Sequence, residues 1–270
     1  MCGTCGCSSE ENKIMLLAPD TAESQPKHKH DYDHTHEHSH DHSHEHNHGH
    51  THHHKVIEVE ADVMHHNDLM AAKNRGFFEA KGILALNLVS SPGSGKTSIL
   101  ERTLIDLKDE MSFYVIEGDQ KTQNDAKRIA ALDIPVVQIN TGKGCHLESE
   151  IVLDAVRKLQ MEDNAILMIE NVGNLVCPSM FDLGESKRVV IISTTEGDDK
   201  PLKYPDMFLT SDICIINKTD LLPYLDADIE MIKQNALKVN PNLIFFEVSA
   251  TKGDGMQDWY HWLKKQYNLI

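Results

Sequence analysis

Residues 83–97 are Ile83-Leu84-Ala85-Leu86-Asn87-Leu88-Val89-Ser90-Ser91-Pro92-Gly93-Ser94-Gly95-Lys96-Thr97, an apolar run followed by a loop of small residues that ends on Lys and Thr. A helical pattern follows directly. Backbone N–H groups in such a loop can surround a phosphate, and the helix N-terminus adds partial positive charge. The context predicts a phosphate-binding loop rather than an ordinary Gly-rich turn, although Ser90 stands where such loops usually have their first Gly. The residues expected to contact a nucleotide are Ser91, Gly93, Ser94, Gly95, Lys96, Thr97 and Ser98.

Short apolar runs alternate with helical patterns along the rest of the chain. Runs of this length, bounded by polar segments, are typical of buried parallel strands. The alternation predicts an α/β fold of the P-loop NTPase type, with a doubly wound, mostly parallel sheet of about seven strands and ligands at the carboxyl ends of the strands. The predicted strands are 83–89, 113–116, 136–139, 166–169, 189–192, 213–216 and 244–248. The predicted helices are 96–107, 123–132, 147–159, 229–239 and 256–267.

The N-terminal part of the chain has a different composition. Residues 1–55 have almost no apolar periodicity, and 14 of the 18 His residues fall between His28 and His54. Such low-complexity segments do not bury enough apolar surface to fold, so a disordered, Cys- and His-rich metal-binding tail is predicted. Residues 56–270 are expected to form one GTPase domain, beginning with a leading helix over about 56–82.

Charge and cysteine content exclude several classes of protein. The formal charge of −16, with 42 acidic against 26 basic residues, argues against nucleic-acid binding, which needs clustered Lys and Arg. No secretory signal and no run of roughly 18 apolar residues is present, so a cytoplasmic protein without a membrane span is expected. The spacing of the 6 Cys is no disulfide framework.

A second motif concerns the choice of base. Asn217-Lys218-Thr219-Asp220 follows the strand predicted at 213–216. A carboxylate there can accept both the N1–H and the 2-amino protons of guanine, which adenine does not offer, so a buried Asp220 would discriminate strongly between the two. Alone, this motif could be a solvated turn. About 120 residues after a phosphate-binding loop it favours GTP, with the base contacted by Asn217, Lys218, Asp220, Ser249 and Ala250.

Candidate magnesium ligands and catalytic residues follow the ends of other predicted strands. Hard oxygen ligands suit Mg²⁺, and Asp119 and Glu170 follow predicted strands, so they are expected to bind Mg²⁺ with Thr97. Lys96 is expected to reach the β and γ phosphates, which makes Lys96, Thr97, Asp119 and Glu170 the candidate catalytic residues. The Gly173 amide, three residues after Glu170, is in the place of a phosphate-sensing switch. No arginine finger or water-orienting Gln can be assigned, so slow intrinsic hydrolysis is predicted.

Two segments of the tail are candidate sites for other metals. Cys2, Cys5 and Cys7 place three thiols within six residues, which suits nickel or zinc. The His tract has imidazoles that are mostly neutral near pH 7 and can bind Ni²⁺, Cu²⁺ or Zn²⁺ at several loose sites, which favours storage. A passive solubilising tract is the alternative.

A third candidate metal site lies in the globular part of the chain. Cys145 and His146 follow one predicted strand and Cys177 follows another, so these three side chains are expected to converge near the switch as a nickel or zinc site. Water or a second subunit would supply a fourth ligand. Cys214, inside a predicted strand, is expected to be a core residue.

These motifs together resemble the HypB family of hydrogenase nickel-incorporation GTPases. The resemblance rests on the phosphate-binding loop, on Asn217 to Asp220, on Cys145-His146, and on Glu170-Asn171-Val172-Gly173-Asn174-Leu175-Val176-Cys177-Pro178, and it covers roughly 61–270. The Cys2-Gly3-Thr4-Cys5-Gly6-Cys7 start is similar to that family's N-terminal nickel motif, and the His tract resembles its nickel-storing stretch.

The resemblance implies a function, cofactors and partners. It implies a GTP-dependent homodimer that uses GTP and Mg²⁺, binds Ni²⁺ or Zn²⁺, and delivers nickel during [NiFe]-hydrogenase maturation. It also implies two partners, a small zinc-containing HypA-type chaperone and the hydrogenase large-subunit precursor, and a metal site of Cys145, His146 and Cys177 that responds to the nucleotide. A urease accessory GTPase and a nickel or zinc storage protein are the alternatives.

Overall fold

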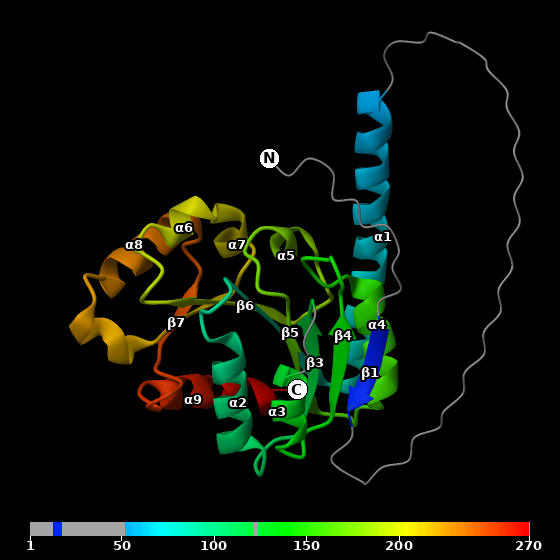
Figure 1. Cartoon of the computed structure of the whole chain (residues 1–270). Helices are drawn as coiled ribbons and strands as arrows, with labels where there is room; N and C mark the ends of the chain where they lie inside the picture. Colours follow the sequence, from blue (N-terminus) through cyan, green and yellow to red (C-terminus); the bar gives the residue numbers. More distant parts are fainter. Residues whose placement is uncertain (1–12, 18–51, 121–123, 270) are drawn as a thin grey trace, which may run out of the picture.

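The computed structural model describes residues 13–17, 52–120 and 124–269. The described chain forms an eight-stranded sheet with helices on both faces (Figure 1). The strands are β1 (Lys13–Leu17), β2 (Ile83–Ser90), β3 (Phe113–Asp119), β4 (Val136–Asn140), β5 (Ala165–Glu170), β6 (Lys187–Ser193), β7 (Ile213–Asn217) and β8 (Ile244–Glu247). The helices are α1 (His52–Lys81), α2 (Lys96–Leu107), α3 (Asn124–Ala130), α4 (Ser149–Leu159), α5 (Cys177–Met180), α6 (Lys200–Lys203), α7 (Pro205–Leu209), α8 (Ile229–Val239) and α9 (Met256–Tyr267), with a 3₁₀ helix η1 (Thr219–Tyr224).

The order of the strands places β2 in the middle of the sheet. The order is β1-β4-β3-β5-β2-β6-β7-β8, and every neighbouring pair is parallel except β1 and β4. On one side of β2 lie β5, β3 and β4, which come next in the chain, and on the other side lie β6, β7 and β8, which follow them. Ligands bind at such a reversal of strand order. All seven predicted strands are present, which confirms the predicted mostly parallel sheet.

The core forms on both faces of this central strand. Leu84, Leu86 and Leu88 of β2 point to the face covered by α2, α3 and α9. Ile83 and Ala85 point to the opposite face, which α1 and α4 cover over one half of the sheet. Helices α7 and α8 cover the other half of that face. Because both faces are covered, every residue of β2 is buried, as its nearly continuous apolar run predicts.

Strand β1 is an addition that the sequence analysis did not predict. It lies within the segment 1–55 and pairs antiparallel with β4, with Lys13 opposite Asn140 and Leu17 opposite Val136. The Nζ of Lys158 also donates to the carbonyl oxygen of Ile14 at 3.0 Å. The run 14–17 is as long as several runs predicted as strands, but it stands alone in a low-complexity segment with no helical pattern beside it, and its pairing depends on the free edge of β4. Cys2, Cys5, Cys7 and most of the His tract lie outside the described residues.

Helix α1 is held against the domain by polar contacts as well as by Phe78. Asn74, fully buried, donates to the carbonyl oxygens of Ser149 and Leu183 at 2.8 and 3.0 Å. Gly184 has φ +83°, and a Cβ there would lie 2.5 Å from the carbonyl oxygen of Ala71. Helix α1 can therefore approach Gly184 this closely because the glycine has no Cβ. None of the described helices is both long and apolar enough to cross a membrane.

Replacing Gly184 should separate backbone strain from crowding. Gly142 also has a positive φ, +58°, but has nothing within 4 Å of a Cβ. We expect Gly142→Ala to cost about 1–2 kcal/mol through backbone strain. Gly184→Ala should cost ~1–3 kcal/mol more, because overpacking adds to that strain. Chemical denaturation of both variants measures the difference, and equal losses would show that the space beside α1 does not limit the size of residue 184.

Candidate functional site

A cleft of about 570 Å³ opens at the carboxyl ends of β2, β3 and β5. The loop after β2 forms one wall, and the ends of β3 and β5 form the other. Nine of the residues predicted to bind the nucleotide or Mg²⁺ line it: Ser91, Gly93, Gly95, Lys96, Thr97, Ser98, Asp119, Glu170 and Lys218. The structure thus brings together side chains that lie up to 127 residues apart in the sequence.

The loop has the backbone conformation that its glycines predict. Gly93 and Gly95 have φ of +80° and +92°, in the region that favours glycine. A Cβ on Gly95 would collide with the side-chain amide of Asn217. That amide donates to the carbonyl oxygen of Ser94 at 2.9 Å, and Lys218 Nζ donates to the carbonyl oxygen of Gly93 at 2.6 Å. The segment predicted to select the base therefore also braces the phosphate loop.

Glu170 is the centre of the polar contacts inside the cleft. Its Oε1 lies 3.0 Å from Lys96 Nζ and accepts a hydrogen bond of 2.6 Å from Thr97. Its Oε2 is buried and has no hydrogen-bond partner among the described residues. An orphaned carboxylate oxygen near a Thr hydroxyl is a suitable donor set for Mg²⁺, and Asp119 lines the same cleft. Thr97, Asp119 and Glu170 therefore fit the predicted magnesium ligands.

Glu117 is a buried carboxyl group that the sequence analysis missed. It is 2% exposed and lies opposite Glu170 in the pairing of β3 with β5. Burial, with the nearby charges of Glu170 and Asp119, raises the pKa of Glu117 to about 8. The apolar run ends at Ile116, but β3 continues to Asp119. Side chains alternate along a strand, so Glu117 lies on the same covered face of the sheet as Phe113 and Val115.

The base-recognition motif begins at the end of β7, as predicted. Ser249 Oγ donates to Asp220 Oδ1 at 2.6 Å, and the Ala250 amide donates to Asn217 Oδ1 at 3.2 Å. Asp220 lies in the first turn of η1, three residues after Asn217, which holds the phosphate loop. Asn217 and Ser249 are 2% and 0% exposed, so their roles here are to fix the loop and the carboxylate. A contact of Asp220 with guanine stays a prediction.

Glu196 is a second residue that the sequence analysis missed. Its Oε1 accepts from Ser94 Oγ and from the Ser193 amide, both at 2.8 Å, and its Oε2 lies 3.1 Å from Lys200 Nζ. Burial opposes the charge, but the hydrogen bonds prevail and hold the pKa of Glu196 below its ordinary value. Glu196 follows β6, the strand beside β2, so a rule that examined every strand end next to the loop would have found it.

The predicted metal cluster of the globular domain is present as a geometric arrangement. The ligand atoms of Cys145, His146 and Cys177 all lie within 4.8 Å of one another, and each residue is half-buried. Cys145 and His146 belong to the loop between β4 and α4, and Cys177 is the first residue of α5. Cys214 is fully buried in β7, and burial raises the pKa of its thiol, which confirms a core role.

The ring of His146 has a fixed position in this cluster. It stacks on Phe181, with 3.8 Å between ring centroids and 23° between ring planes. Its Nδ1 faces Cys145 Sγ at 3.6 Å. Stacking on Phe181 and the contact with Cys145 together restrict the orientation of the ring. Phe181 was not predicted, because a stacking partner four residues after Cys177 has no sequence pattern.

The cluster and the nucleotide cleft share one segment of chain. Residues 170–177 run from Glu170, in contact with Lys96 and Thr97, to Cys177 in the metal cluster. Gly173 packs on the phosphate loop, since a Cβ there would lie 3.3 Å from Pro92 Cα. Asn174 donates to the carbonyl oxygen of Cys145 at 3.4 Å. The two sites are therefore separated by only a few residues of one chain segment.

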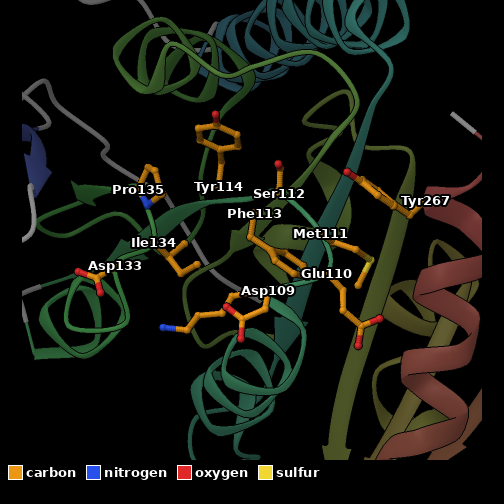
Figure 2. Close-up of a pocket in the computed structure, with 11 residues that line it drawn as sticks. Asp109, Glu110, Met111, Ser112, Phe113, Tyr114, Asp133, Ile134, Pro135 and Tyr267 are labelled. Carbon is orange, nitrogen blue, oxygen red and sulfur yellow. The ribbon is translucent and has the colours of Figure 1, made fainter.

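A further hollow, of about 380 Å³, lies away from this site (Figure 2). It is formed by 108–114 and 133–135, at the amino ends of β3 and β4, and by Tyr267, the last residue of α9. No residue predicted to bind a nucleotide or a metal lines it. The chemistry of the described residues is thus concentrated at the carboxyl edge of the sheet.

The relationship to known proteins agrees with this geometry. The nucleotide-binding domain of the CobW/HypB/UreG type matches residues 84–247. The hydrogenase maturation factor HypB of Rhizobium leguminosarum bv. viciae is 57% identical over 210 residues, which are 78% of this chain and 70% of the relative. The chain belongs to the HypB family. The matched domain contains the phosphate loop, the Asn217–Asp220 motif and the Cys145, His146 and Cys177 cluster.

Two solved HypB structures have the same fold. HypB from Archaeoglobus fulgidus is 37% identical, with a TM-score of 0.70 over 75% of this chain and 98% of that chain. HypB from Helicobacter pylori, solved in complex with nickel, is 38% identical, with a TM-score of 0.69 over 75% of this chain and 95% of that chain. This family membership confirms the resemblance inferred from the sequence motifs.

The raised pKa of Glu117 predicts a pH dependence of stability. Between its ordinary pKa of 4.5 and about 8, the folded protein holds a proton that the unfolded chain has lost. The free energy of unfolding should therefore fall as pH rises through this window, by at most ~1.4 kcal/mol per pH unit. Glu117→Gln should flatten the slope, whereas Glu162→Gln, at an exposed position, should not. Denaturation at several pH values, with a chelator and without nucleotide, would refute this assignment if both variants keep the original slope.

Proposed function

We propose that this protein is a GTP-hydrolysing metallochaperone that binds nickel, stores it and delivers it during maturation of a [NiFe]-hydrogenase. The observation that carries the proposal is the shared segment 170–177. It begins at Glu170, bound to the phosphate-loop residues Lys96 and Thr97, and it ends at Cys177 in the metal cluster. A protein that only stored metal would not require this connection.

The nucleotide would act on the metal through Glu170. Phosphate oxygens are the natural partners of Lys96 and Mg²⁺ is that of the Thr97 hydroxyl, so a nucleotide bound with Mg²⁺ would compete for both contacts that Glu170 now makes. Thr97, Asp119 and Glu170 would hold Mg²⁺, which neutralises phosphate charge when bound. A nucleotide drives transfer only if metal affinity differs between the GTP and GDP states, typically by a factor of 5–150. Movement of Glu170 supplies a physical source of such a difference.

Hydrolysis is proposed to be slow. The described lining of the cleft contains Lys96 and Lys218 but no Arg, so no arginine in cis is in place to stabilise transition-state charge. Among the described residues of the lining, Lys96, Lys218 and the loop amides would share the phosphate charge with Mg²⁺. Slow turnover is what a switch needs, because each nucleotide state must last long enough for metal to be bound or released.

The donor set of the cluster suits nickel or zinc as cargo. Two thiolates and an imidazole are ligands for both ions, and three protein ligands leave one position open. Water or a second subunit would complete the site, which supports a homodimer whose interface lies at the metal. Release to a partner requires an incomplete site of this kind, since a closed four-ligand site holds its ion as a structural element.

The remaining roles follow from the tail and the family. Cys2, Cys5 and Cys7 and the His tract would supply nickel storage ahead of the domain site. A HypA-type zinc-containing chaperone and the hydrogenase large-subunit precursor are the proposed partners, in the cytoplasm. The relatives named hydrogenase maturation factors favour a hydrogenase over a urease as the target. Storage without transfer is the remaining alternative.

Replacing Cys177 tests the nucleotide control of nickel. The assay would use the full-length chain with Cys2, Cys5 and Cys7 changed to Ser, so that the thiolate-to-nickel absorption reports only nickel at the domain site. Nickel affinity should differ between GDP and a non-hydrolysable GTP analogue, and Cys177→Ala should remove the difference while GTP affinity changes less than about threefold. Cys214→Ala, which alters a core thiol, is the control. Identical affinities in both nucleotide states of the unaltered site would favour simple storage.

Replacing Asp220 tests the preference for guanine. Asp220→Asn keeps an oxygen for Ser249 but presents a donor to the base. GTP affinity should fall by at least ~10²-fold, because two charged hydrogen bonds of about 1.5–3 kcal/mol each are lost. Xanthosine triphosphate, which has a 2-oxo group, should gain affinity. Calorimetric titration measures both, with Asp226→Asn, an exposed position, as control. Unchanged GTP binding by the Asp220 variant would contradict the assignment.

A further inference from the structure

Asn171 connects the nucleotide cleft to the loop that carries His146. It follows Glu170 directly and is 1% exposed. Its side-chain oxygen accepts from the Leu147 amide at 3.2 Å and from the Val172 amide at 2.9 Å. Leu147 is the neighbour of His146 in the loop before α4. One side chain thus connects the residue after Glu170 to the residue after a metal ligand.

The orientation of this side chain is determined by its partners. The two backbone N–H donors require an oxygen on their side, so the Asn171 amide nitrogen must face the other way. There it donates to Asn87 Oδ1 at 3.2 Å. Asn87 Nδ2 in turn donates to Glu185 Oε1 at 3.0 Å. A carboxylate can only accept hydrogen bonds, so the nitrogen of Asn87 must face Glu185. Both amides therefore have one allowed orientation, and Asn87 holds Asn171 in it.

The same network reaches the chain on the far side of Cys177. Glu185 accepts from Arg188 Nε at 2.9 Å. The guanidinium of Arg188 donates to the carbonyl oxygens of Ser179 and Phe181 at 3.1 and 2.8 Å. Arg188 and Glu185 have side chains only 7% and 6% exposed. Both segments that supply metal ligands are thus tied to one buried set of hydrogen bonds.

Leu147 is also held by its side chain at the nucleotide cleft. A Cβ on Gly118, which lines the cleft, would lie 2.9 Å from a terminal carbon of Leu147. The loop before α4 therefore meets the end of β3 through this leucine and the end of β5 through its amide. A shift of Glu170 would displace Asn171 and, because a buried N–H is costly to leave unpaired, would move Leu147 with it.

We propose that Asn171, oriented by Asn87, is the positioning residue through which the nucleotide sets the place of His146. The inference rests on the proposed function, because it needs nickel at the Cys145, His146 and Cys177 cluster. It adds a second connection to the chain segment that leads from Glu170 to Cys177. One connection moves Cys177 and the other moves His146, so two of the three ligands would respond together to the nucleotide.

The test measures the ratio of nickel affinities in the GDP and GTP-analogue states. It uses the full-length chain with Cys2, Cys5 and Cys7 changed to Ser, and nickel absorption of the domain thiolates as the signal. Asn171→Leu, close in size but unable to bind Leu147 or Asn87, should reduce a ratio of about 5–150 to within about twofold of one. Asn87→Leu should reduce it less, because Asn171 can still reach Leu147.

A double variant and a matched control make the test specific. If Asn87 acts only through Asn171, adding Asn87→Leu to Asn171→Leu changes the nickel affinity in neither nucleotide state, whereas an independent effect of Asn87 would change at least one of the two affinities. Asn235→Leu replaces another buried Asn, which donates to the Asp198 carbonyl oxygen, and should leave the ratio unchanged. Thermal unfolding checks each variant, and Asn171→Ser replaces Asn171→Leu if the latter does not fold.

The outcomes distinguish this inference from the proposed function. A normal ratio in the Asn171 variant, a further change of nickel affinity in the double variant, or an equal loss in the Asn235 control would each overturn the positioning role while leaving GTP-controlled nickel binding intact. A ratio of one before any asparagine is changed would instead overturn the proposed function, and the positioning role with it. Loss of the ratio in the Asn171 variant alone, with no further change of nickel affinity in the double variant, supports the inference.

Discussion

The contact of Glu170 with Lys96 and Thr97 is the interaction on which the rest of the site depends. A carboxylate that is 1% exposed is stable as an anion only if it is paired, and Lys96 supplies the charge. The pairing requires β5 to lie beside β2 in one register, with Leu88 opposite Glu170. That register in turn places Gly173 on the phosphate loop. A single buried ion pair thus sets the position of the segment that leads to the metal cluster.

The sequence predicted the fold well because its strands are buried on both faces. A run such as 213–216, apolar and bounded by polar residues, has few alternatives, and β7 is found at Ile213–Asn217. The phosphate loop and the Cys145, His146 and Cys177 cluster were also predictable, because the ends of parallel strands meet at one edge of a sheet. Helix ends were less so. Leu147 was predicted as helical, but α4 begins at Ser149, after an extended Glu148.

What escaped prediction depends on contacts between distant parts of the chain. Glu117 and Glu196 are polar residues near strand ends, and their importance arises from burial and from neighbours on other strands. Phe181 matters because it stacks on His146. Asn87 interrupts the apolar run of β2, and only the structure shows that its amide faces Asn171 and Glu185. In each case the residue type was visible in the sequence, but its partner was not.

Strand β1 covers one edge of the sheet. By pairing with β4 it covers an edge whose N–H and C=O groups would otherwise be open to another chain. Sheet edges left open in this way are sites of aggregation, and β4 is itself a run of buried residues next to the loop of Cys145. Strand β1 therefore protects the edge of β4 from pairing with another chain. A shortened chain that begins at Val56 would lose that protective strand and leave the backbone groups of β4 open.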